Sequence, residues 1–252
     1  MKMRIEYAWF TMKGPVRANN EDNLRYPDEC LPLHHEDAEM SGSVPAGPSA
    51  WFAVFDGMGG AVHGETASYL AAKELGEQIV LKANGLAISD AESCRMMNAR
   101  ILEHVMVNRT KGMGSTAAAL CFDEDHIHGF NAGDSRCYVF SEGTLRQLSD
   151  DHAVFSPITG RGQLTQCLGI PESEFVLEPK EIEEQYRTGD LYLICSDGLS
   201  GALSDKRIAG ILSGSGTLNE KLLRLREAVT KRGAEDNTTV ILIAVRQIGQ
   251  AS

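Results

Sequence analysis

The hydrophobic positions along the chain follow two patterns, one typical of strands buried on both faces and one typical of helices that pack by one face. The first pattern is clearest at residues 51–55, where WFAVF runs without a polar residue and ends at Asp56 and a glycine-rich turn. LYLIC at residues 191–195 repeats it and is followed directly by Ser-Asp-Gly. Both runs are short and end at a turn signal, so we predict two buried strands.

The same criteria assign the rest of the chain. Further strands are predicted at 6–12, 115–123, 127–131, 137–140, 145–148, 178–186 and 238–245. Apolar residues three and four apart predict helices at 64–82, 89–107, 205–212 and 218–232. Polar, turn-forming segments predict loops at 14–26, 28–49 and 149–171. Several strands together with helices are compatible with the α+β class.

The composition favours one globular domain. A sheet-rich chain of 252 residues can fold undivided, and its hydrophobic content of 42% supports a large core. No repeat or low-complexity linker divides it, so we expect a single domain over residues 1–252.

The charge and the apolar runs exclude several kinds of partner. A net charge of −11 argues against general binding to nucleic acid or to anionic membranes. The longest apolar runs, such as residues 240–245, are far too short to span a membrane. The N-terminal residues show no secretory signal pattern. We therefore expect a cytoplasmic protein with neither nucleic-acid nor membrane partners.

Six cysteines are spread along the chain without any C-x-x-C spacing. Several lie in apolar strand-like runs, where a free cysteine behaves as a small core residue. We therefore expect free thiols in a reducing compartment, with neither a disulfide framework nor a zinc site.

Four aspartates stand where predicted strands begin or end: Asp56, Asp134, Asp197 and Asp236. Each alone is equally well explained by a tight turn or a helix cap. If they meet at one end of stacked sheets, however, they cannot all stay ionised without counter-cations. Carboxylates beside the bare carbonyls of a glycine turn suit Mg²⁺ or Mn²⁺, and a two-metal cluster can activate water and clamp a phosphoryl group.

The polar segment 14–26 adds a cation and an acidic pair. Arg17 has the planar side chain that binds phosphate through two parallel hydrogen bonds, and Glu21 with Asp22 could hold metal-bound water. Taken alone, this segment is better explained as a solvated loop. Together with the four aspartates, it makes metal-assisted phosphoester hydrolysis the leading functional class.

Six motifs in this order resemble the metal-dependent type 2C protein serine/threonine phosphatases. They are GPVRANNED, VFDGMGG followed by GETAS, GMGST, NAGDSRCY, ICSDGLSG and EDNTTVIL. The resemblance extends from Gly14 to Val245, and DGMGG and the chain length are most similar to bacterial members.

The resemblance implies a fold and an activity. The fold would be an αββα sandwich, in which two packed antiparallel sheets are flanked by helices. The activity would be hydrolysis of phosphoserine and phosphothreonine in proteins by a metal-activated water at a binuclear Mn²⁺ or Mg²⁺ centre. Many members hold a third ion. The implied partners are phosphorylated proteins and a cognate serine/threonine kinase.

The resemblance also implies a metal-ligand set. Asp56 would bridge two ions, the Gly57 carbonyl would bind one, and Asp197 with Asp236 would complete the shell of the other. Asp134 would hold the third ion together with Asp197.

The remaining roles implied by the resemblance fall to residues outside that set. Glu21, with Asp22, would hold metal-bound water, and Arg17 would bind the substrate phosphate. Asn237 would orient nearby groups.

The chain departs from the family in two places. Met58 occupies the position where many eukaryotic members carry a histidine proposed as general acid, and Ala61 replaces a histidine common in bacteria, with His63 two residues later. The flap segment, about 152–171, is short, which implies an open cleft.

Two alternative functions remain open at this stage. One is hydrolysis of small phosphorylated metabolites at the same metals. The other is a catalytically weak module that only senses or binds phosphate.

Overall fold

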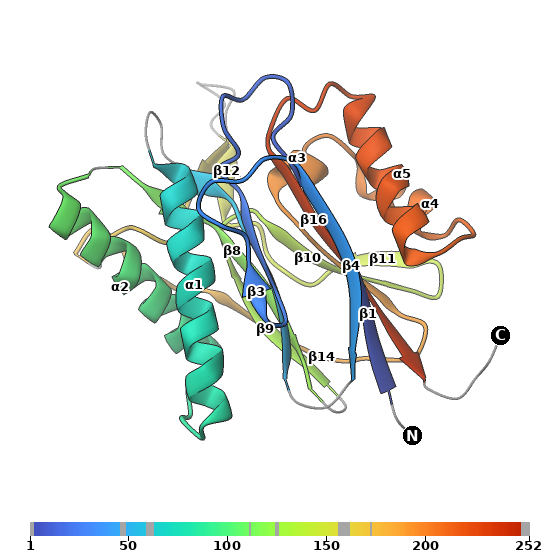
Figure 1. The fold of residues 1–252 in the computed structure, drawn as a ribbon, viewed down its shortest axis with the longest axis horizontal. Helices are drawn as coiled ribbons and strands as arrows, with labels where there is room; N and C mark the ends of the chain where they lie inside the picture. Colours follow the sequence, from blue (N-terminus) through green and yellow to red (C-terminus); the bar gives the residue numbers. More distant parts are fainter. Residues whose placement is uncertain are drawn as a thin grey trace.

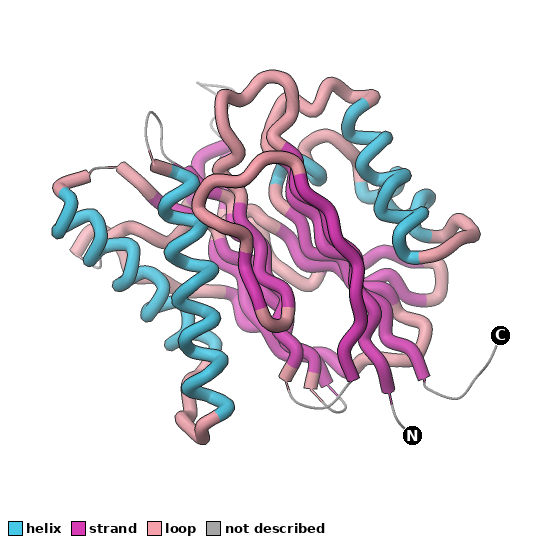
Figure 2. The backbone as a smooth tube through the Cα atoms, in the orientation of Figure 1, coloured by secondary structure: helices cyan, strands magenta, loops and turns pink. Residues whose placement is uncertain are grey.

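The computed structural model describes residues 3–45, 49–58, 63–110, 112–123, 126–155, 162–171 and 173–247. Two six-stranded antiparallel sheets lie face to face, and helices cover the outer side of each (Figures 1 and 2). This is the αββα sandwich that the resemblance implied, so the predicted fold class is confirmed.

The first sheet contains both terminal strands of the fold. Its order is β11 (Thr144–Gln147), β10 (Arg136–Ser141), β15 (Leu191–Cys195), β16 (Thr238–Gln247), β1 (Met3–Met12) and β4 (Ala38–Pro45). The central pairing of β1 with β16 extends over ten residues, from Met3 opposite Gln247 to Met12 opposite Thr238.

The second sheet contains the WFAVF strand. Its order is β14 (Lys180–Gln185), β9 (His126–Ala132), β8 (Ala117–Phe122), β5 (Ala50–Phe55), β2 (Asn23–Tyr26) and β3 (Glu29–Cys30). Two short ribbons lie beside the sheets. They pair β6 (Gly57–Met58) with β7 (Gly114–Ser115), and β12 (Ala153–Phe155) with β13 (Gly162–Leu164).

The helices form the two outer layers. Those that pack on the second sheet are α1 (Gly64–Ala83) and α2 (Asp90–Asn108). Those that pack on the first are α3 (Asp197–Ser200), α4 (Asp205–Leu212) and α5 (Leu218–Thr230). Hydroxyl side chains cap three of the five N-termini, and at α5 Thr217 forms a reciprocal capping box with Glu220. No helix among the residues with described positions has the length and hydropathy to cross a membrane.

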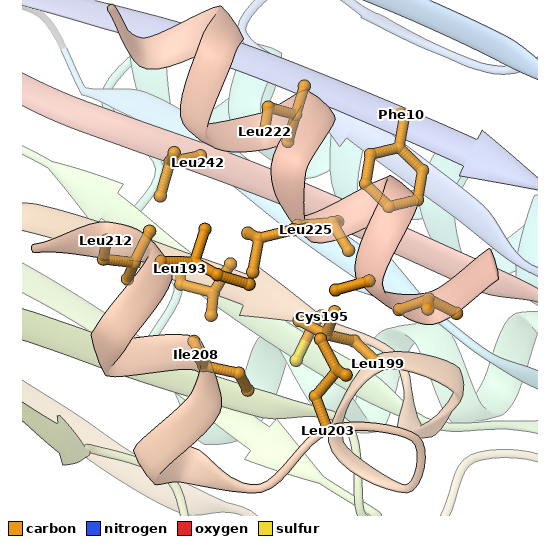
Figure 3. Close-up of a cluster of buried hydrophobic side chains, with 14 of the residues drawn as sticks. Phe10, Leu193, Cys195, Leu199, Leu203, Ile208, Leu212, Leu222, Leu225 and Leu242 are labelled. Carbon is orange, nitrogen blue, oxygen red and sulfur yellow. The ribbon is translucent and has the colours of Figure 1, made fainter. Parts of the chain in front are cut away.

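Apolar side chains fill all three interfaces between the four layers. Leu193, Leu222 and Leu225 belong to the outer cluster between the first sheet and its helices (Figure 3). Between the sheets, the ring of Phe52 lies edge-on to that of Phe122, with centroids 5.7 Å apart. The strands pack on both faces, which explains why their sequences are apolar runs.

The predicted strands and helices correspond to elements of the structure, but the three predicted loops contain strands. The loop expected at 28–49 is wrong because it contains β3 and β4. β4 is an edge strand with mostly exposed side chains, so its sequence, AEMSGSVP, lacks the apolar alternation that identifies a strand. The segment 14–26 contains β2, and 149–171 contains the β12–β13 ribbon.

Phe52 provides a test of the central layer. Phe52→Ala should lower the free energy of unfolding by about 3–5 kcal/mol, because it removes a fully buried ring from a packed interface. Met106→Ala, at a side chain on α2 that is 73% exposed, should change it by less than about 0.5 kcal/mol. Urea denaturation of both variants measures these values. Equal losses would contradict the assignment of Phe52 to the core.

Candidate metal centre

The predicted site residues converge at one end of the sandwich. Asp56 follows β5, Asp197 opens α3 directly after β15, and Asp236 precedes β16. β15 and β16 are antiparallel, with Cys195 opposite Val240, so the end of one lies beside the start of the other. The three aspartates lie in the wall of a cleft of about 450 Å³. The described residues that line it are Arg17, Ala18, Asn19, Glu21, Asp56, Gly57, Met58, Asp197, Asp236 and Asn237.

Backbone hydrogen bonds fix Asp56 at the end of its strand. The Asp56 N–H donates to Thr116 Oγ1 (3.0 Å), and the Thr116 N–H donates to the Asp56 carbonyl (2.9 Å). Thr116 Oγ1 also hydrogen-bonds Ser135 Oγ at 2.7 Å, beside Asp134. Thr116 therefore links the two turns that carry Asp56 and Asp134. Sequence reasoning missed it, because a threonine between two strands gives no pattern that reveals its partners.

Gly57 allows the Glu21 segment to approach the strand end. Its N–H donates to the Glu21 carbonyl (3.1 Å), which also accepts from Ser68 Oγ (2.6 Å). A Cβ atom at Gly57 would collide with the carbonyl oxygens of Glu21 and Gly64. Only glycine leaves room for this contact.

Asn237 holds the Arg17 segment against the end of β16. Its Oδ1 accepts from the Glu21 N–H (2.9 Å), and its Nδ2 donates to the carbonyls of Lys13 (2.9 Å) and Asn19 (3.0 Å). One side chain thus fixes both ends of the segment that carries Arg17. This gives a structural basis to the orienting role that the resemblance implied.

Asp22 lies below the cleft rather than in its wall. Its side chain is fully buried, and Oδ2 accepts from Ser196 Oγ at 2.8 Å. The same Ser196 oxygen accepts from the Thr239 N–H at 3.0 Å. Burial raises the pKa of Asp22 to about 7. Asp22 thus contacts Ser196, which precedes Asp197, and the structure does not place it beside Glu21 in the cleft lining.

The carboxylates of the cleft raise one another's pKa values. Burial is the largest cause and raises the pKa of Asp197 to about 6, with Asp134 and Asp236 contributing next. Burial is also the largest cause that holds the pKa of Asp56 well above its usual range. The negative charges of Asp22 and Asp197 are the next largest causes. The pKa of Glu21 is raised by burial and then by Glu65. Such a group of acids needs cations to remain ionised together.

Arg17 is the one cationic side chain among the described residues that line the cleft. Its Nη2 donates to Asp236 Oδ2 at 2.6 Å, and this hydrogen bond raises the pKa of the guanidinium. The Arg17 and Asp236 side chains are 49% and 36% exposed, so the pair is accessible from the cleft. One guanidinium cannot balance the clustered carboxylates.

The residues of the cleft fit divalent cations of the Mg²⁺ or Mn²⁺ type. The donors are carboxylate oxygens and the Gly57 carbonyl, and no histidine or cysteine is among the described lining residues. Asp134 does not line this cleft, but its charge is the largest neighbouring contribution to the pKa of Asp197.

Met58 and His63 occupy different places around the site. Met58 lines the cleft, whereas His63 is the N-cap residue of α1 in a left-handed conformation (φ 84°). His63 is not among the lining residues. Ala61 lies outside the described residues.

The sequence and the fold both match known proteins. The family model described as Protein phosphatase 2C matches residues 33–237. The serine/threonine protein phosphatase PstP of Mycobacterium tuberculosis is 32% identical over 254 aligned residues, which cover 96% of this chain and 45% of PstP. This chain therefore spans less than half the length of that relative.

Two crystal structures of PstP match over nearly the whole of this chain. The Mycobacterium tuberculosis enzyme gives a TM-score of 0.76 at 27% identity, covering 97% of this chain and 100% of the other. The PstP catalytic domain in complex with two manganese ions gives 0.75 at 27% identity, with the same coverage. The motifs, the fold and these matches agree, and the chain belongs to the protein phosphatase 2C family.

Proposed function

We propose that this chain is a metal-dependent protein phosphatase that hydrolyses phosphoserine and phosphothreonine, with residues 1–252 acting as one catalytic domain. The observation that carries the proposal is the convergence of Glu21, Asp56, Asp197 and Asp236 on one cleft beside a single arginine. This arrangement can hold divalent cations and an anionic substrate together. Membership of a family whose relative PstP is a serine/threonine phosphatase supports the same activity.

The metal ligands would come from the ends of β5 and β15, the start of β16 and the turn between β9 and β10. Asp56, the Gly57 carbonyl, Asp197 and Asp236 would hold two Mn²⁺ or Mg²⁺ ions, and Glu21 would accept hydrogen bonds from their water ligands. Asp134 with Asp197 would hold a third ion. Bound ions of this kind neutralise phosphoryl charge and lower the pKa of water.

Arg17 would bind the substrate phosphate. Its planar side chain can donate two parallel hydrogen bonds to phosphate oxygens. In the described structure Arg17 is paired with Asp236. Arg17 can therefore bind phosphate only when Asp236 has another partner, and a metal ion would be such a partner. Asn237 keeps the Arg17 segment in place through its bonds to Lys13 and Asn19.

Phosphorylated proteins are the proposed substrates, and a cytoplasmic serine/threonine kinase is the proposed source of those phosphates. The relative PstP is a serine/threonine protein phosphatase, and the described residues that line the cleft are mainly polar. Hydrolysis of small metabolites is therefore the less favoured alternative, and intact metal ligands argue against a module that only binds phosphate.

Metal removal tests the ion requirement. EDTA should abolish hydrolysis of a phosphopeptide, Mn²⁺ or Mg²⁺ should restore it, and Zn²⁺ should restore it poorly because the cleft lacks nitrogen and sulfur ligands. Asp197→Asn should lower Mn²⁺ affinity by more than about 100-fold, beyond the effect expected for an outer-shell group. Asp205→Asn, at an aspartate bonded to Tyr138, is the matched control. Full activity in a metal-stripped sample would contradict the proposal.

Arg17→Ala tests the phosphate contact. It should raise KM for a phosphopeptide about tenfold or more with a smaller loss of kcat, because it removes binding shared by substrate and transition state. Arg17→Lys should recover only part of this affinity, since lysine cannot form the two parallel bonds. Arg146→Ala removes a comparable exposed pair (2.6 Å to Glu184) and should change neither constant. Unchanged constants for Arg17→Ala would make its segment structural.

His63→Ala tests whether His63 is a general acid. Because His63 caps α1 and does not line the cleft, hydrolysis of a phosphopeptide should slow by less than about tenfold, below the usual contribution of a positioned acid. The rate with p-nitrophenyl phosphate should change even less, since its leaving group needs no proton. A hundredfold loss on the phosphopeptide alone, with metal affinity and folding intact, would identify His63 as the acid.

A further inference from the structure

The opposite end of the sandwich carries a second group of metal-ligating side chains. β8 begins beside Thr116 at the cleft and ends at Phe122, so its six residues place this group roughly 20 Å from the cleft. Figure 1 shows that α1 ends and α2 begins toward this end of the molecule. The group contains Cys121, Asp123, His126 and His128.

Strand pairing brings these side chains to one face. Cys121 lies directly opposite His128 in the β8–β9 ladder. Because side chains alternate along a strand, Asp123 and His126, each two residues away, point to the same side. The Asp123 N–H donates to the His126 carbonyl at 3.0 Å, which holds these two residues side by side.

The donor atoms are spaced like the ligands of a small ion. Asp123 Oδ2 lies 3.5 Å from His126 Nε2 and 3.5 Å from His128 Nε2. Cys121 Sγ lies 3.9 Å from Asp123 Oδ1, and donor atoms of Cys121, Asp123 and His128 all lie within 4.8 Å of one another. A zinc tetrahedron with bonds of about 2.0–2.3 Å has ligand-to-ligand edges of about 3.3–3.8 Å.

His128 is held as a metal-binding histidine usually is. Its Nδ1 lies 2.8 Å from Asp90 Oδ2, which leaves Nε2 directed at Asp123. Trp51 packs edge-on against the imidazole, with centroids 5.1 Å apart, and Lys82 lies 3.6 Å from Asp90. A carboxylate that fixes one ring nitrogen orients the other toward a metal.

The charges of the group also favour a cation. Asp123 supplies a negative charge, and its Oδ2 lies 3.5 Å from the Nε2 atoms of both His126 and His128. Asp123 and His128 are 25% and 28% exposed at the side chain, and His126 lines a surface hollow with Glu183 and Tyr186. The group is therefore accessible from the His126 side, while Cys121 itself is buried.

We propose that Cys121, Asp123 and His128 bind one Zn²⁺-type ion, with His126 or a water molecule as the fourth ligand. Thiolate and imidazole select such an ion over Mg²⁺. The ion would join the β8–β9 turn to the start of α2 through Asp90. This proposal revises the expectation that the chain has no zinc site, which rested on the absence of C-x-x-C spacing in the sequence. Here the ligands become neighbours only when the strands pair.

Cobalt substitution tests the proposal in the intact chain. Co²⁺ added to the metal-stripped protein, with excess Mg²⁺ present to occupy the carboxylate cleft, should bind one equivalent and give a sulfur-to-cobalt charge-transfer band. The described lining of the cleft contains no cysteine, so this band does not arise there, and the variants below assign it to Cys121. Zn²⁺ should displace the Co²⁺ and remove the band. Absence of any sulfur-to-cobalt band would overturn the proposal.

Variants identify the ligands. Cys121→Ala should remove the band, His128→Gln should lower Zn²⁺ affinity more than about 100-fold, and Asp90→Asn should lower it about 10–100-fold. Cys94→Ala is the matched control, because Cys94 is fully buried in the same core cluster but is not part of the donor group.

Each variant gives a decisive result. Retained phosphatase activity shows that a variant is folded, and if Cys121→Ala does not fold, His128→Gln decides. A band that survives in Cys121→Ala, unchanged Zn²⁺ affinity in His128→Gln, or a band lost in Cys94→Ala would each refute the assignment.

Discussion

The concentration of negative charge at one end of the sandwich is the constraint on which the functional site depends. Burial and mutual repulsion raise the pKa values of Asp56 and Asp197, so the folded chain alone cannot keep all its site carboxylates ionised. Divalent cations relieve this repulsion and, once bound, favour an anionic substrate. The same unfavourable cluster that weakens the metal-free fold thus provides the binding energy for the ions.

The scaffold around the cluster is built from hydrogen bonds that connect separate turns. Thr116 links the Asp56 turn to Ser135, and Asn237 links the start of β16 to the Arg17 segment. Both sheets contribute to the cleft, since Asp56 follows a strand of one and Asp197 follows a strand of the other. The relative position of the carboxylates therefore depends on how the two sheets pack. The apolar layer around Phe52, which holds the sheets together, indirectly determines the geometry of the site.

The two ends of the sandwich offer different donor chemistry. The cleft presents oxygen ligands, which suit hard and exchangeable cations, whereas the β8–β9 end presents sulfur and imidazole nitrogen, which suit a tightly held ion. The proposed catalytic centre and the proposed zinc site thus differ in ligand type within one chain. The length of β8 keeps the two apart.

Much of this protein could be predicted from its sequence. The apolar runs 51–55 and 191–195 identified strands, the alternating four- and three-residue spacing in 218–232 identified α5, and the aspartates after those strands marked the candidate site. These features depend on local periodicity and on residues adjacent to strand ends. Tertiary structure alone decided the rest. β4 is a strand because it pairs with the edge of β1, and Asp22 is buried because the chain packs around Ser196. Cys121 lies opposite His128 because of the register between β8 and β9. Such relations join residues distant in sequence, and no local pattern encodes them.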